Sequence, residues 1–121
     1  MCESAENYLK TILLLQRKLG VVRSVDVANE RGVSRPSVCN AVKKLQANGM
    51  VAKGKDHTLL LTERGERQAL SILERHTVIE RFLIDELKVD RQTAHRDSCQ
   101  LEHLLSEETV ARLRDRNKTA E

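Results

Sequence analysis

The stretch GVSRPSVCN, residues 32–40, lies between two short helical patterns and decides the fold of the N-terminal half. Before this stretch, Ser24 can cap a short helix that ends at Gly32. Within the stretch, Ser34 can cap a second helix that runs to Gly49. The predicted connection is only about three residues long and is centred on Gly32. Two short helices joined by so tight a turn are typical of a helix-turn-helix motif.

The flanking segments extend this motif to a winged helix-turn-helix. Apolar residues recur at helical spacing over residues 4–19, which predicts a helix before the motif. Residues 50–53 and 58–61 predict two strands around a polar turn, and a small β-hairpin in that place is a wing. Residues 1–62 are therefore predicted to form a DNA-binding domain.

Residues 63–121 predict a second, helical domain, so the fold class is mainly α. A long helix is expected to reach about Lys88, and Asp90 can cap the next helix, which continues through Leu104. A last short helix opens at Ser106 and ends in a polar tail. The long helix has more apolar surface than one small winged helix can cover, which predicts a homodimer. Its interface is expected on residues 69–87 with Leu101, Leu104 and Leu105.

Composition and charge restrict the classes of partner. With 121 residues, the chain has room for one compact domain or two very small ones. One Tyr, one Phe and no Trp argue against the stacking platforms of RNA and single-strand binders. Residues 1–60 carry ten Lys and Arg against five acidic residues, while residues 61–121 carry eleven against thirteen. This basic front half indicates a polyanionic partner.

The sequence also predicts a cytoplasmic protein. Its N-terminus lacks a basic region followed by an apolar run, and no segment approaches the ~20 apolar residues of a spanning helix. The three cysteines are an odd number without close pairing, which argues against a disulfide framework.

The second helix of the motif has a polar face that can read DNA. Small polar groups and Asn40 near its N-terminus can reach base edges in a major groove, and basic side chains around them can contact phosphates. The alternative is a solvated charged face used for protein contacts; the wing and the basic half favour DNA. The predicted DNA-binding residues are Arg23, Ser34, Arg35, Pro36, Ser37, Cys39, Asn40, Lys43, Lys44, Lys53 and Lys55.

Two clusters of metal-ligand residue types follow in the second domain. After Asp90, the predicted helix places His95, Cys99, Glu102 and His103 within roughly a 100° arc of one face. On the long helix, His76 and Glu80 form an i, i+4 pair that can bind one cation. Each residue alone has a plainer explanation, since a lone Cys is more often buried core. Their combination predicts a metal site, from which His57 in the wing turn is left out.

Five segments carry a resemblance to the diphtheria toxin repressor family, the iron- and manganese-dependent bacterial repressors. They run in the same order over about residues 3–113. They are Glu6–Ile12, Arg35–Val38, Leu61–Thr62 with Gly65, Arg75–His76 and Cys99–Ser106. The resemblance implies a homodimer that binds a palindromic operator when loaded with Fe(II) or Mn(II), as a repressor in metal homeostasis. It also implies a principal site of Cys99, Glu102 and His103 with a ligand from the first helix, and another site of His76, Glu80 and His95.

The chain departs from the family pattern at three points. Asn7 stands where iron-type members have Met and manganese-type members have Asp. Its amide oxygen is a neutral, weaker donor, so the principal site is expected to bind metal less tightly or to complete its shell with water. Lys10 replaces a second acidic ligand of the manganese type and Cys99 replaces its Glu; both favour an iron-type site, with Fe(II) first and Mn(II) second. The chain is also expected to lack the SH3-like C-terminal domain of many iron-type members.

Two other functions compete with this interpretation. A metal-indifferent winged-helix transcription factor would use the same DNA-binding half and respond to another ligand. A small metalloenzyme would use open metal positions to activate water, but no separate general base or substrate cleft is evident from the sequence. We therefore expect a regulator and not an enzyme.

Overall fold

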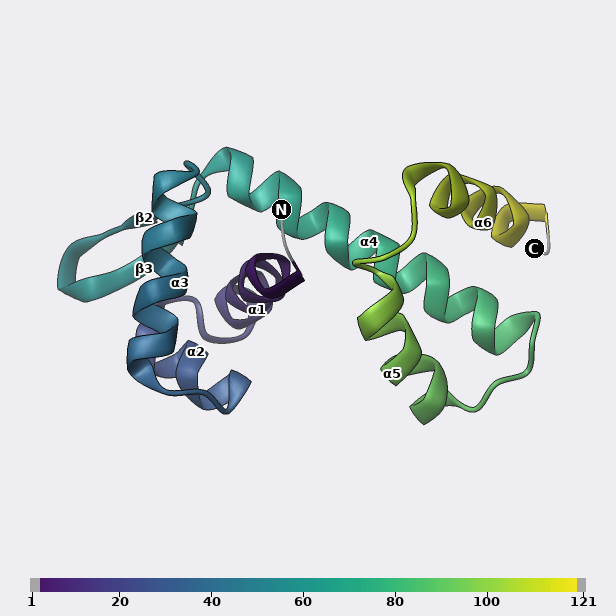
Figure 1. Cartoon of the computed structure of the whole chain (residues 1–121), viewed down its shortest axis with the longest axis horizontal. Coiled ribbons are helices and arrows are strands. Elements are labelled where there is room, and N and C mark those ends of the chain that lie inside the picture. The colour runs from purple at the N-terminus through teal and green to yellow at the C-terminus, as the bar shows by residue number, and fades with distance from the viewer. Residues whose placement is uncertain (1–2, 120–121) are drawn as a thin grey trace. The chain divides into compact units, whose positions relative to one another are not determined.

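The computed structural model describes residues 3–119, which contain six α-helices, one 3-10 turn and a three-stranded sheet (Figure 1). The predicted mainly helical fold with a winged helix-turn-helix is confirmed. The chain divides into two compact units, Met1–Leu70 and Ser71–Glu121. Helix α4, Glu63–Asp85, contributes residues to both units. Within residues 3–119, we find no helix with the length and apolar character to span a bilayer.

The N-terminal unit contains helices α1 (Glu3–Leu19), α2 (Ser24–Arg31) and α3 (Arg35–Ala47). Gly32 ends α2 with a φ of 66°, and the Ser34 hydroxyl accepts a hydrogen bond from the Ser37 backbone N–H at 3.2 Å. Both features confirm the predicted turn and cap. The predicted cap of α2 was wrong by one residue.

Arg23, and not Ser24, occupies the N-cap position of α2. The backbone N–H of Arg23 donates to the Asp26 carboxylate at 2.9 Å, so an acidic side chain inside the first turn closes the helix end. The extended Arg23 also belongs to strand β1, Val22–Arg23, which the sequence analysis did not predict. Two residues are too short to show an alternating pattern.

The sheet has the strand order β1-β3-β2 and is antiparallel throughout. Strands β2 (Val51–Lys53) and β3 (Thr58–Leu61) form the predicted wing, with Val51 opposite Leu61. On the other side of β3, Val22 pairs with Leu59, and both side chains are buried. The wing is thereby attached to the helix-turn-helix core. Other buried side chains of this unit include Leu9, Ile12, Val27, Val38, Val42 and Leu45.

Helix α4 begins against the backbone of the wing. The Thr62 hydroxyl donates to the Gly49 carbonyl at 2.6 Å and accepts from the Gly65 N–H at 3.0 Å. A Cβ on Gly65 would collide with the carbonyl of Met50. This close approach explains glycine in the first turn of a helix.

The C-terminal unit contains the rest of α4, α5 (Arg91–Leu101) and α6 (Glu107–Thr119). Helix α4 ends at Asp85, short of the predicted Lys88, which has a left-handed φ of 57°. The polar tail expected after α6 is instead helical. Asn117 is buried there and its amide donates to the Val78 carbonyl at 3.1 Å, so this polar turn packs onto α4.

The predicted extent of α5 was also wrong. The helix ends at Leu101 because the following N–H groups of His103 and Leu104 bond to carbonyls only three residues back, those of Gln100 and Leu101. This tighter turn changes the rotation per residue. Glu102 still has an αR backbone and its N–H donates to the Ser98 carbonyl at 3.0 Å, so the path of the chain departs from the α-helix only from His103 onward.

Candidate metal centre and nucleic-acid interface

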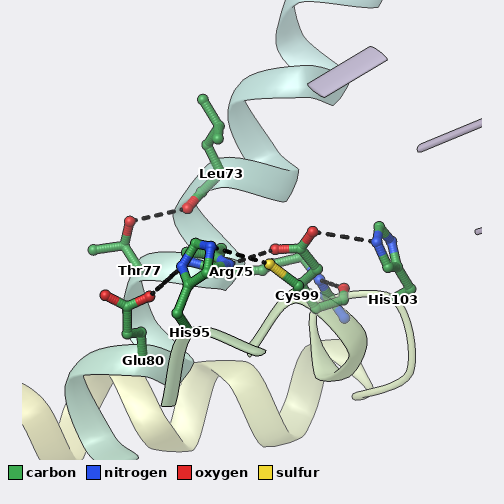
Figure 2. A network of polar contacts seen from close by, with 9 residues as sticks. Leu73, Arg75, Thr77, Glu80, His95, Cys99 and His103 are labelled. Atoms are coloured by element: carbon green, nitrogen blue, oxygen red, sulfur yellow. Dashed lines mark hydrogen bonds and ion pairs between the residues drawn. The ribbon is translucent and has the colours of Figure 1, made fainter. Parts of the chain in front are cut away.

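Two helices of the C-terminal unit each present a pair of ligand-type side chains one turn apart (Figure 2). Helix α4 carries His76 and Glu80, and α5 carries His95 and Cys99. Glu80 Oε2 lies 2.8 Å from His76 Nε2 and 3.2 Å from His95 Nδ1. Cys99 Sγ lies 3.7 Å from His95 Nε2. Ligand atoms of His76, His95 and Cys99 all lie within 4.8 Å of one another.

Glu102 continues this cluster beyond the end of α5. Its side chain is 0% exposed, and its two oxygens lie 2.9 Å from His76 Nδ1 and 3.2 Å from His103 Nε2. The His103 side chain is itself only 1% exposed. A buried carboxylate needs such partners, because an unpaired charge there would be costly. The contacts therefore form one series through Cys99, His95, Glu80, His76, Glu102 and His103.

The donor set fits a divalent transition-metal ion. Imidazole nitrogens, a thiol and carboxylates are the ligand types that such ions take in proteins. His76 has a carboxylate oxygen against each ring nitrogen, so both contacts together require a proton on each nitrogen or on one of the carboxyl groups. Metal binding at these atoms must displace protons.

Arg75 holds the turn that carries Glu102. Its Nε donates to the Glu102 carbonyl at 2.8 Å, and its Nη2 donates to the Leu105 carbonyl. Its Nη1 contacts the Glu107 carboxylate at 2.7 Å. No role for Arg75 was predicted, although it precedes His76 in a family-like segment. Its backbone contacts across 27 and 30 residues have no signature in sequence spacing.

Asp90 fixes the other end of α5. Its carboxylate accepts from the Thr93 backbone N–H at 3.0 Å and from the Thr93 hydroxyl at 2.8 Å. The backbone N–H of Thr93, followed by its hydroxyl, holds the pKa of Asp90 below its usual range. This cap begins the helix that positions His95 and Cys99 and confirms the predicted start.

The structure groups the predicted ligands differently from the two separate sites that the resemblance implies. Cys99 Sγ lies with His76 and His95, and His76 in turn contacts Glu102. Asn7 lies on α1 in the N-terminal unit, where it is half-buried. Its backbone carbonyl accepts a hydrogen bond from the Thr11 hydroxyl at 2.8 Å. The assignment of all seven residues as metal ligands stays a prediction.

The predicted DNA-reading face of α3 is exposed. Val38, Val42 and Leu45 are buried on the opposite face. The Ser37 hydroxyl lies 2.8 Å from that of the capping Ser34. All eleven predicted contacts are solvent-exposed, namely Arg23, Ser34, Arg35, Pro36, Ser37, Cys39, Asn40, Lys43, Lys44, Lys53 and Lys55.

Two hollows flank this face within the N-terminal unit. One, of about 330 Å³, lies between α1 and α3 and includes Tyr8, Asn40 and Lys44 in its lining. The other, of about 470 Å³, brings Arg23 and Arg35 together with His57 of the wing turn. His57 was not among the predicted site residues, although its position two residues after Lys55 in a basic wing turn is a signal for a role in DNA binding.

Two family models together match residues 1–59 and 62–121. The first is described as the iron dependent repressor N-terminal DNA binding domain, and the second as the iron dependent repressor metal binding and dimerisation domain. The chain belongs to the iron-dependent repressor family. This membership confirms the resemblance to metal-dependent transcriptional repressors.

Individual relatives agree with the family assignment. The chain is 34% identical over 115 residues to an HTH-type transcriptional regulator of Methanocaldococcus jannaschii, covering 94% of this chain and 92% of the relative. It is 37% identical to the transcriptional regulator MntR of Escherichia coli, covering 89% of this chain and 69% of the relative. Both relatives are named as transcriptional regulators.

The fold is also that of solved members of the family. A manganese-dependent transcriptional repressor in complex with manganese matches with a TM-score of 0.85 and 31% identity, covering 94% of this chain. This chain spans about half the length of that structure, 52%. The iron-dependent repressor IdeR of Mycobacterium tuberculosis is 28% identical, covering 93% of this chain and 49% of the relative. The family thus includes both manganese-dependent and iron-dependent members.

Proposed function

We propose that this chain is a metal-activated transcriptional repressor that binds a palindromic operator as a homodimer. The observation that carries the proposal is the cluster of His76, His95 and Cys99 ligand atoms within 4.8 Å, in a chain that also has a winged helix. Metal-ligand chemistry and an exposed DNA-reading helix in one small chain are what a metal-responsive regulator requires. Glu80, Glu102, His103 and Asn7 complete the proposed ligand set.

Fe(II) is the proposed effector, with Mn(II) second. A thiolate and imidazoles are softer donors than an all-oxygen shell, so Fe(II), Co(II), Ni(II) and Zn(II) should bind more tightly than Mn(II). Cells select among these ions partly by availability, which favours iron. Lys10 and Cys99, in place of acidic residues, support the same choice.

Activation follows from a difference in metal affinity between two arrangements of the chain. Asn7 lies on α1, in the same unit as the helix-turn-helix, while the other proposed ligands lie on α4, on α5 and in the turn after α5. A bound ion favours the DNA-competent arrangement only as far as it binds that arrangement better than the other. Cys99, Glu102 and His103 supply the ion's ligands from the C-terminal unit.

The dimer is proposed to form through apolar side chains of the C-terminal unit. Leu87 is 57% exposed and Leu104 is 72% exposed, while Leu101 and Leu105 are half-buried. These residues lie within the region that matches the metal binding and dimerisation domain. A two-fold axis then places two α3 helices about one turn of DNA apart.

The experiment is operator binding across a series of divalent ions. Duplexes that bind the Fe(II)-loaded protein are first selected from a random-sequence pool, and fluorescence anisotropy then measures their affinity with each ion and with chelator. The proposal predicts tight binding with Fe(II), weaker activation by Mn(II), and loss of binding with chelator. An affinity that stays flat across all ions would instead identify a metal-indifferent winged-helix regulator.

A further inference from the structure

The hollow between the wing and the helix-turn-helix has a basic lining drawn from three elements. Arg23 comes from β1, Arg35 from the first turn of α3, and His57 from the wing turn. Ser24 and Val25 at the start of α2 add uncharged surface, and among the described residues that line the hollow Asp56 is the acidic one. Its volume is about 470 Å³, and Arg23, Arg35 and His57 are all solvent-exposed.

The wing turn is held in an unusual backbone conformation that places His57 at this hollow. Asp56 and His57 have consecutive left-handed φ angles of 58° and 61°. The turn is closed by the Gly54 N–H, which donates to the Thr58 carbonyl at 2.8 Å, and by the Thr58 hydroxyl, which donates to the Lys55 carbonyl at 2.9 Å. Non-glycine residues in this region are uncommon and often belong to functional sites.

We propose that Arg23, Arg35 and His57 form a binding site for one phosphodiester group of the DNA backbone, and that protonation of His57 makes DNA affinity pH-dependent. This inference rests on the proposed function, because the ligand is the DNA that the repressor binds. Two fixed guanidinium charges position the phosphate, and the imidazole adds a third charge only when it is protonated.

The bound phosphate determines the direction of the effect. The charged groups around His57 are Arg23 and Arg35 on the neighbouring elements and Lys55 and Asp56 in the same turn. A phosphodiester placed among these cations adds a negative charge that favours protonated His57. DNA binding should therefore take up a proton, and affinity should rise as the pH falls from about 8 to about 6.

Two substitutions separate the charge of His57 from its shape. His57→Asn removes the charge at every pH and keeps a residue type that tolerates a left-handed φ. His57→Lys keeps a positive charge at both pH values. Thermal unfolding by circular dichroism checks that both variants fold like the wild type. If one variant does not fold, the other variant still has a fixed charge with which the wild type can be compared at both pH values.

The measurement is the dissociation constant of a random-sequence duplex of about three helical turns, by fluorescence anisotropy with saturating metal. Near pH 6 the wild type should bind like the Lys variant and about two- to five-fold more tightly than the Asn variant. Near pH 8 it should bind like the Asn variant. The slope of log affinity against log salt concentration should change in the same way, by about 0.9 for each protomer. Any pH dependence of metal loading is common to all three proteins.

Three results would overturn the inference. Equal affinities of wild type and the Asn variant near pH 6 would remove His57 from the phosphate site while leaving the proposed function intact. A wild type that binds like the Lys variant near pH 8 as well as near pH 6 would show that protonation of His57 does not control DNA affinity. Loss of metal-dependent duplex binding by all three proteins would contradict the proposed function and this site with it.

Discussion

His76 Nδ1 lies 2.9 Å from Glu102 Oε2, which joins helix α4 to the turn after α5. The other ring nitrogen of His76 contacts Glu80 at 2.8 Å. The resemblance implies that Glu102 and His76 serve separate metal sites. In this chain, one imidazole contacts a carboxylate from each predicted site. The two sets of predicted ligands therefore contact one another, and we expect occupancy of one set to alter metal binding by the other.

Arg75→Ala should destabilise the protein and weaken metal binding together. The substitution removes donors to the Glu102 and Leu105 carbonyls and to Glu107, and leaves part-buried acceptors without their partner. We expect a loss on the order of 2 kcal/mol in the free energy of unfolding. Urea denaturation and calorimetric metal titration measure the two effects, with the exposed Arg112→Ala as the matched control. A normal metal affinity in the Arg75 variant would show that the hydrogen bonds of Arg75 do not position Glu102.

Gly65→Ala should destabilise the N-terminal unit, although alanine is the better helix former. The added Cβ would meet the Met50 carbonyl, so the start of α4 or the wing must shift. We expect a cost of about 1–3 kcal/mol in the free energy of unfolding. The exposed Gln68→Ala on the same helix is the control and should be neutral or stabilising. A stability gain for Gly65→Ala in thermal unfolding would contradict the close packing.

The Asp90 cap predicts a pH-dependent stability. A carboxyl whose pKa is lowered by folding stabilises the protein above its unfolded-state pKa, and this contribution is lost as the pH falls through the folded-state value. Asp90→Ala should therefore lower the melting temperature at neutral pH and lower it less in acid. Asp90→Asn keeps the hydrogen-bond acceptor and should retain part of the stability without the pH dependence. Equal deficits of the Ala variant at both pH values would exclude the charged cap.

Asn40 and Lys44 are predicted to have different roles in DNA binding. Asn40→Ala should cost about 1–3 kcal/mol of binding free energy on the selected operator and little on random duplexes. Lys44→Ala should weaken both similarly and reduce the salt slope by about 0.9 for each protomer. Anisotropy titrations on both duplexes distinguish base reading from phosphate contact. Equal losses on both duplexes for Asn40→Ala would remove Asn40 from base reading.

Short-range signals accounted for most of the fold. Ser34, Gly32 and Asp90 act through neighbours within five residues, so their roles as caps and stops could be predicted from spacing alone. The misplaced boundaries depend on distant contacts. The polar end of α6 is helical where Asn117 bonds to Val78, 39 residues away. Strand β1 exists because Val22 pairs with Leu59.

The residues of the candidate site could be proposed from the sequence, but the contacts between their side chains could not. Ligand residue types at helical spacing and the family-like segments indicated His76, Glu80, His95, Cys99, Glu102 and His103. Their contacts join residues far apart in the chain, such as His76 and Glu102 at 2.9 Å across 26 residues, which helical spacing does not encode. The hollow at His57 depends on the path of the wing, which no local pattern encodes.

The most direct test of the account is metal-dependent operator binding by Cys99→Ala and Glu102→Gln. Anisotropy with the selected operator is measured over an Fe(II) titration, with light scattering and circular dichroism to confirm that dimer and fold are intact. The exposed Glu108→Gln, which should behave like wild type, is the control. Both site variants should lose the Fe(II)-dependent increase in affinity. A wild-type metal response in both variants would contradict the role of Cys99 and Glu102 in metal sensing and leave sensing to His76, Glu80 and His95 alone.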